Sequence, residues 1–131
     1  MSTPLTITVT DEPVLTMHLS GRLDTETHEM LLEAARAAHA AGARRLLLDL
    51  SDIEFITSAG LGTIQRIFKL FTPAAEMDAW VPEDRGEPYK SPYFKMACAP
   101  PDVYYILNLA GFVRNIYIFP DLPGALKSFA G

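Results

Sequence analysis

One leucine-rich run constrains the fold of this chain more than any other feature of its sequence. Residues 46–50 read Leu-Leu-Leu-Asp-Leu, a nearly continuous apolar stretch of strand length. Strands with one solvated face alternate apolar and polar residues, whereas a continuous apolar run is typical of a strand covered on both faces. We therefore expect the strand Leu46–Leu50 to lie in the interior of a sheet.

Helices are expected before and after this strand. Asp24 is suited to cap a first helix, whose apolar stripe ends in the alanines before Gly42. A second helix is predicted from about Ser58 to Phe71, with Ser58 or Thr57 as its N-cap, and we interpret the residues 51–57 as a connection. Apolar residues at steps of three and four indicate this second helix, namely Leu61, Ile64, Ile67, Phe68 and Phe71.

The remaining patterns continue an alternation of strands and helices. Residues 5–10 and 14–19 predict a hairpin, and later segments predict a strand at 93–97, a helix from Pro101 to Gly111, a strand at 115–119 and a terminal helix at 122–129. A chain of 131 residues fits a single domain. The fold class that follows is α/β, with a mixed β-sheet and helices packed mainly on one side.

Residues 72–92 interrupt this regular pattern. The segment contains four of the ten prolines, five acidic and two basic residues, and an isolated Trp80. Connections of this length within one domain are often functional. We interpret 72–92 as a loop insertion that is dispensable for folding, with Trp80, Tyr89, Tyr93 and Phe94 either contacting a partner or covering the edge of the domain.

Composition narrows the classes of function. The net charge of -5 disfavours nucleic acid as a partner, and no apolar run is long enough to insert into a membrane. The single Cys98 suits a reducing compartment, so a cytoplasmic location is expected. His28 and His39 lie roughly 16 Å apart on one predicted helix, too far apart to share a metal ion. We therefore expect no metal and no cofactor.

Catalytic motifs are incomplete in this sequence. Ser58 follows a strand and begins a helix, but it lacks the glycine two residues earlier that a hydrolase nucleophile turn uses. Gly60 and Gly62 resemble part of a phosphate-binding loop, yet no Lys-Ser/Thr pair follows them. The sequence therefore predicts no catalytic residues and no enzyme.

Three motifs in the expected order resemble the signature of STAS domains, the family of bacterial anti-sigma factor antagonists and sulfate transporter C-terminal domains. The first and most specific is residues 47–62, Leu-Leu-Asp-Leu-Ser-Asp-Ile-Glu-Phe-Ile-Thr-Ser-Ala-Gly-Leu-Gly. The others are Gly-Arg-Leu-Asp at 21–24 and Asn-Leu-Ala-Gly-Phe at 108–112. This resemblance covers nearly the whole chain apart from residues 72–92.

The resemblance implies a protein-binding switch. In the antagonist branch, an anti-sigma factor with serine kinase activity phosphorylates the serine that corresponds to Ser58, and a serine phosphatase reverses the modification. A phosphate at a helix N-terminus meets unpaired backbone N–H groups, which supports this role for Ser58. The partner-binding residues implied are Asp24, Thr57, Ser58, Ala59, Gly60 and Leu61. A homodimer is also compatible with the resemblance.

Thr57 departs from the family pattern, which has an acidic residue at this position. Thr57 is therefore an alternative phosphorylation site, or the protein acts without phosphorylation. Asp24 either supplies the missing carboxylate or only caps its helix. A second function stays open, in which the chain is a STAS adaptor subunit of an ABC-type lipid transport complex and contacts its ATPase, with Thr57 as the contact.

Overall fold

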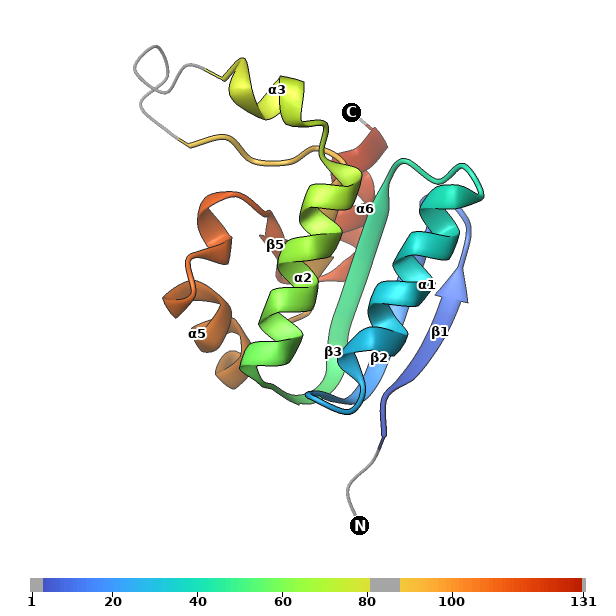
Figure 1. Ribbon diagram of the computed structural model, residues 1–131, viewed down its shortest axis with the longest axis vertical. Coiled ribbons are helices and arrows are strands. Elements are labelled where there is room, and N and C mark those ends of the chain that lie inside the picture. Colours follow the sequence, from blue (N-terminus) through green and yellow to red (C-terminus); the bar gives the residue numbers. More distant parts are fainter. Residues whose placement is uncertain (1–3, 81–87, 131) are drawn as a thin grey trace.

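One mixed β-sheet organises the chain. The structure, a computed structural model, describes residues 4–80 and 88–130. The sheet has the strand order β1-β2-β3-β4-β5, in which β1 pairs antiparallel with β2 and the later neighbours pair in parallel (Figure 1). The strands are Thr6–Thr10 (β1), Thr16–Leu23 (β2), Leu46–Ile56 (β3), Phe94–Ala97 (β4) and Ile118–Phe119 (β5). The predicted α/β fold with a mixed sheet is confirmed.

The strand β3 occupies the centre of the sheet, as its leucine run predicts, but it is longer than expected. Residues 51–56 are not a connection: they continue β3 and pair with the second half of β2. Their polarity misled the prediction, because β4 pairs with β3 only as far as Asp49. Beyond that point the β4 side of β3 has no paired strand, and two exposed residues precede each of the buried Ile53 and Ile56.

The helices divide unequally between the two faces of the sheet. The main core cluster contains residues of α1 (His28–Ala40), α2 (Ser58–Phe71) and α5 (Pro101–Leu109), together with Leu46, Leu48 and Leu50. A smaller cluster joins Leu47 to α6 (Leu122–Ala130). Successive side chains of a strand point to opposite faces, so the leucine run fills both clusters. Figure 1 shows α1 and α2 in front of the sheet and α6 behind it.

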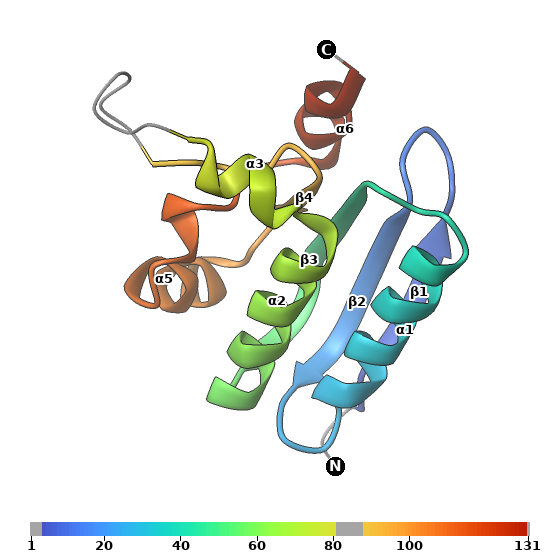
Figure 2. The ribbon, with the colours of Figure 1, turned by 45° about the horizontal axis from the view of Figure 1, so that its top comes forward.

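The segment that follows α2 contains structure that the sequence did not predict. A short helix, α3 (Ala74–Asp78), follows Pro73, and Met77 packs against the main core (Figure 2). Ser91 is fully buried, where its Oγ lies 2.9 Å from that of Thr72 and accepts the N–H groups of Tyr93 and Phe94. Phe94 belongs to the core and not to a partner surface. Residues 81–87 of the expected insertion lie outside the described residues.

The C-terminal segment differs from the prediction in one strand. The strand expected at 115–119 is reduced to the two residues of β5, because the N–H groups of Asn115 and Ile116 donate back to the Phe112 carbonyl of a 3-10 helix, η1 (Phe112–Arg114). The terminal helix α6 is held by two cations near its C-terminus. Lys95 Nζ donates to Ser128 Oγ at 2.9 Å, and Arg45 Nη1 donates to the Phe129 carbonyl at 3.1 Å.

Candidate functional site

The N-terminus of α2 presents Ser58 to solvent. Thr57 is the N-cap residue, and Ser58 is the first residue of the helix and is exposed. The Thr57 N–H donates to the Leu23 carbonyl at 3.0 Å, which ties the start of α2 to the end of β2. The Thr57 hydroxyl makes no capping hydrogen bond; its Oγ1 is buried and has no hydrogen-bond partner within the described part of the chain. Two adjacent hydroxyls therefore differ sharply in access.

Two glycines in the first turns of α2 have different roles. A Cβ at Gly60 would lie 2.7 Å from the Leu23 carbonyl oxygen, 2.8 Å from Leu23 Cγ and 3.0 Å from Ile56 Cγ2. Gly60 therefore allows α2 to approach β2 closely. A Cβ at Gly62 would meet nothing within 4 Å, and this residue is exposed. The fold thus requires Gly60, whereas Gly62 keeps the surface beside Ser58 bare.

The first turn of α2 is electrically favourable for an anion. It contains no acidic side chain. The first helical hydrogen bond runs from the Leu61 N–H to the Thr57 carbonyl at 2.9 Å, so the N–H groups of Ser58, Ala59 and Gly60 precede the helical ladder. Together with the helix dipole, these donors leave partial positive charge at the helix end. Ala59 and Leu61 are half-buried and flank the exposed Ser58.

Asp24 organises the neighbouring turn between β2 and α1. Its Oδ1 accepts the N–H groups of Glu26 and Thr27 at 3.0 and 3.2 Å, while its own N–H donates to Thr27 Oγ1 at 2.9 Å. The prediction that Asp24 caps the first helix is wrong for α1 itself, whose N-cap residue is Thr27; Asp24 caps the turn that precedes it. Burial raises the pKa of Asp24, but these hydrogen bonds and the charge of Arg22, 3.5 Å away, outweigh burial and hold the pKa below its ordinary value.

Phe55 and Arg22 contact each other on neighbouring strands near the signature, and the sequence did not identify them as site residues. They are register partners on β3 and β2, and the Arg22 guanidinium lies 5.8 Å from the centre of the Phe55 ring. Phe55 is 41% exposed. Phe55 lies within residues 51–57, which the sequence pattern predicts to be a connection. Correct placement requires knowing that β4 ends early and leaves this part of β3 uncovered.

Comparison with known proteins matches part of the chain to one protein family. Residues 8–67, from within β1 to near the end of α2, match a family model described as "Mlab, STAS domain". Over these residues the chain matches the STAS domain family. No curated protein matches its sequence.

Solved structures show the same STAS fold over the whole chain. An anti-sigma factor antagonist from Mycobacterium paratuberculosis has 24% identity and a TM-score of 0.77, with 100% of both chains covered. An anti-sigma-factor antagonist (STAS) domain protein from Planctomyces limnophilus has 18% identity and a TM-score of 0.72, covering 95% of this chain and 98% of its own. The phosphorylated form of the Bacillus cell fate determinant SpoIIAA has 11% identity and a TM-score of 0.60, with 94% and 96% covered.

Asp49, the first aspartate of the signature, forms hydrogen bonds within the sheet. Asp49 is buried, its Oδ2 lies 2.7 Å from His18 Nδ1, and its Oδ1 accepts the Ser51 N–H at 3.0 Å. Burial raises the pKa of Asp49, yet the hydrogen bonds from His18 and Ser51 outweigh burial and lower it overall. Asp49 lies within β3 and its carboxylate bonds to His18 of β2, so its role in the signature is structural.

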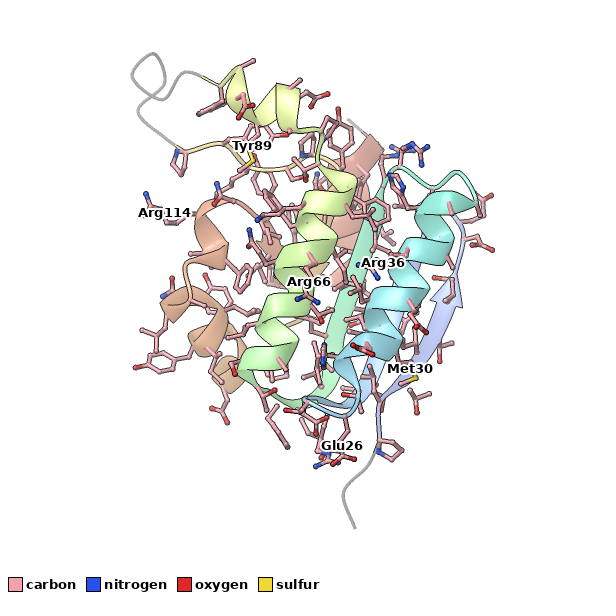
Figure 3. The ribbon with its side chains drawn as sticks, viewed as in Figure 1. Glu26, Met30, Arg36, Arg66, Tyr89 and Arg114 are labelled. Carbon is pink, nitrogen blue, oxygen red and sulfur yellow. The ribbon has the colours of Figure 1, made fainter. Side chains whose placement is uncertain are left out.

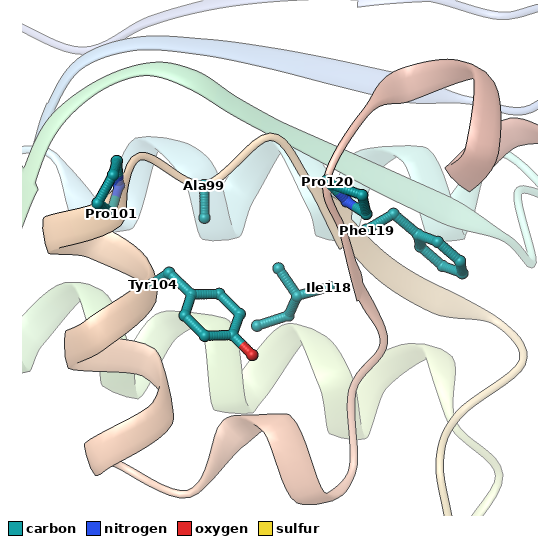
Figure 4. A pocket seen from close by; sticks show the side chains of 6 residues that line it. All are labelled: Ala99, Pro101, Tyr104, Ile118, Phe119 and Pro120. Atoms are coloured by element: carbon teal, nitrogen blue, oxygen red, sulfur yellow. The ribbon is translucent and has the colours of Figure 1, made fainter.

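The described residues can also be compared with the requirements of other kinds of ligand site. Residues 4–80 and 88–130 contain no group of three or more His, Cys, Asp or Glu side chains that could hold a metal ion, and none of their helices is long and apolar enough to cross a membrane. A hollow of about 400 Å³ lies between α5 and β5 (Figure 4). Its lining is apolar apart from the Tyr104 hydroxyl, and it does not include Ser58.

Proposed function

We propose that this STAS protein is an anti-sigma factor antagonist. In this proposal it is not an enzyme: it binds and sequesters an anti-sigma factor with serine kinase activity while Ser58 is unmodified. Phosphorylation of Ser58 by that partner releases the complex, and a serine phosphatase restores binding. The observation that carries the proposal is the exposed Ser58 hydroxyl at the N-terminus of α2, on a first turn without acidic side chains.

The physics of the site supports a switch by charge. A phosphate on Ser58 would add about -1.5 to -2 charges beside unpaired N–H groups, which stabilise it without a change of fold. A partner surface packed against the neutral hydroxyl would then have to desolvate a dianion. The bare surface at Gly62 leaves room for such a partner to approach the helix end. Modification therefore changes binding and leaves stability nearly unchanged.

Geometry favours Ser58 over Thr57 as the acceptor. A kinase must reach the hydroxyl oxygen, and Ser58 is exposed whereas Thr57 Oγ1 is buried. Asp24 directs its carboxylate to the turn that it caps. We therefore infer that Asp24 fixes the shape of the surface that the partner contacts and does not activate the Ser58 hydroxyl.

Substitution of Ser58 separates charge from shape. Ser58→Ala should keep the affinity for the anti-sigma factor, and Ser58→Asp should reduce it at least about tenfold, equivalent to about 1.4 kcal/mol. Asn108→Asp, at an exposed position of α5, is the matched control because it adds the same charge outside the first turn of α2. Incubation with the kinase and ATP, followed by mass spectrometry, should place phosphate on Ser58 in the wild type and none in Ser58→Ala. Phosphate on Thr57 would refute the assignment.

Two observations favour a second candidate, a STAS adaptor subunit that contacts the ATPase of an ABC-type lipid transport complex. The family model that matches residues 8–67 is described as "Mlab, STAS domain" and does not name antagonists. Thr57 also replaces the acidic residue of the antagonist pattern. In this case Ser58→Asp should weaken binding to the ATPase, and no phosphate should be found on Ser58.

A further inference from the structure

The edge strand β1 has a self-complementary sequence. It reads Thr6-Ile7-Thr8-Val9-Thr10, so the pattern of threonine and β-branched aliphatic residues is the same in both directions from Thr8. In an antiparallel pair of two such strands centred on Thr8, each Ile7 faces Val9 of the other copy, and each Thr6 faces Thr10. Chemically matched residues would therefore meet on both faces of the pair.

The outer side of β1 is available for pairing. Within the described residues, β1 pairs with β2 on one side, and four of its five residues are exposed. Edge strands commonly avoid association through charged residues, prolines or bulges, and β1 has none of these. Its flanking residues Pro4 and Asp11 limit pairing to the strand itself. The strand has no charge of its own, so pairing of two copies places no like charges opposite each other within the strand.

An apolar strip follows the same edge on the α1 side of the sheet. Ile7 is partly buried and packs against the main core, so by alternation Val9 points to that side too. Val9 is 48% exposed and Met30 of α1 is 44% exposed. Figure 3 shows Met30 on the β1 side of α1. Pairing of two β1 strands would cover Val9 in each copy.

We propose that two copies of this chain associate through β1, antiparallel, with the two-fold axis at Thr8, and thereby join their sheets. Association should stop at the dimer. The other edge strand, β5, has two residues and is followed by Pro120, so it offers no comparable template. An interface built from two five-residue strands lies below the ~1,600 Å² of standard stable interfaces, so a concentration-dependent equilibrium is expected. This inference does not depend on the proposed function.

Charge pairs at position 8 test both the edge and the axis. Thr8 is exposed, and only residues on the axis face their own copy. Thr8→Lys and Thr8→Glu should each be monomeric because like charges would lie directly opposite, and an equimolar mixture should recover the dimer. Thr25→Lys, an exposed position in the β2–α1 turn, is the control and should dimerise like the wild type.

Sedimentation velocity and light scattering give the masses. For the wild type, the average mass should rise from 14.4 kDa toward twice that value as the concentration approaches about 0.5 mM, a range that suits a weak interface. A wild type that stays monomeric throughout overturns the proposal, as does a Thr8→Lys variant that dimerises like the control. If a variant fails to fold, amide exchange of the wild type decides: protection of the β1 amides must increase with protein concentration, and constant protection overturns the proposal.

Discussion

The two glycines of the signature should respond to alanine with opposite signs. At Gly60 the new Cβ would be 2.7 Å from a backbone oxygen and 2.8 and 3.0 Å from two buried side chains. The Leu23 carbonyl cannot move freely because it accepts the Thr57 N–H at 3.0 Å. Overpacking of this kind costs about 1–3 kcal/mol, and the better helix propensity of alanine returns less than about 1 kcal/mol near a helix end. A net loss of about 1–2 kcal/mol is expected for Gly60→Ala.

Gly62→Ala is the matched variant two residues away. Its Cβ would meet nothing within 4 Å, so the propensity gain of up to about 1 kcal/mol should remain. Urea unfolding followed by circular dichroism gives both free energies of unfolding, which should differ by about 1–3 kcal/mol. Equal stabilities, or a Gly60→Ala variant as stable as the wild type, would refute the close approach of α2 to β2. In binding assays, Gly62→Ala should stay folded and lose affinity for the partner, because the surface at Gly62 would no longer be bare.

Three further predictions follow from buried polar groups. The pKa of Asp49 is lowered in the folded state, so the stability that this carboxylate contributes is fully present above its unfolded pKa of about 3.9. This stability is lost as the pH falls through the pKa of the folded state. The stability of Asp49→Asn should therefore depend less steeply on pH below about pH 4 than that of the wild type. Ser91→Ala leaves two strand N–H groups without their acceptor and should cost about 1–3 kcal/mol in thermal or urea unfolding, whereas an unchanged stability would show that the Ser91 contacts do not matter. Thr57→Val removes a buried unpaired hydroxyl, so its free energy of unfolding should equal or exceed that of the wild type, and a clear loss would contradict the burial of Oγ1.

The sequence predicted the architecture where local patterns decide it. The leucine run placed β3 in the interior, and the apolar spacing with Pro73 predicted α2 with the bounds that it has. Predictions were wrong where tertiary contacts override the local pattern. The polar residues of β3 beyond Asp49 resemble a loop because β4 ends beside Asp49, and two register shifts between β2 and β3 further obscure the alternation.

Only part of the candidate site could be predicted, because local sequence patterns do not show how separate elements pack together. The signature identified Ser58 and its neighbours because they are contiguous in sequence and form one helix end. It could not distinguish the buried hydroxyl of Thr57 from the exposed one of Ser58, since that difference depends on how α2 meets β2. Phe55 and Arg22 come together only through the register of two strands, which no local pattern specifies.

The central claim is that the charge state of Ser58 controls binding, and one titration tests it most directly. The titration uses a kinase-type anti-sigma factor, sought first among the genes beside the one that encodes this chain. Its affinity is then measured by calorimetry for the wild type, Ser58→Ala, Ser58→Asp and the protein phosphorylated on Ser58. We expect equal affinity for the wild type and Ser58→Ala, and an affinity at least about tenfold lower for Ser58→Asp and the phosphorylated protein. Equal affinity of all four would contradict the central claim.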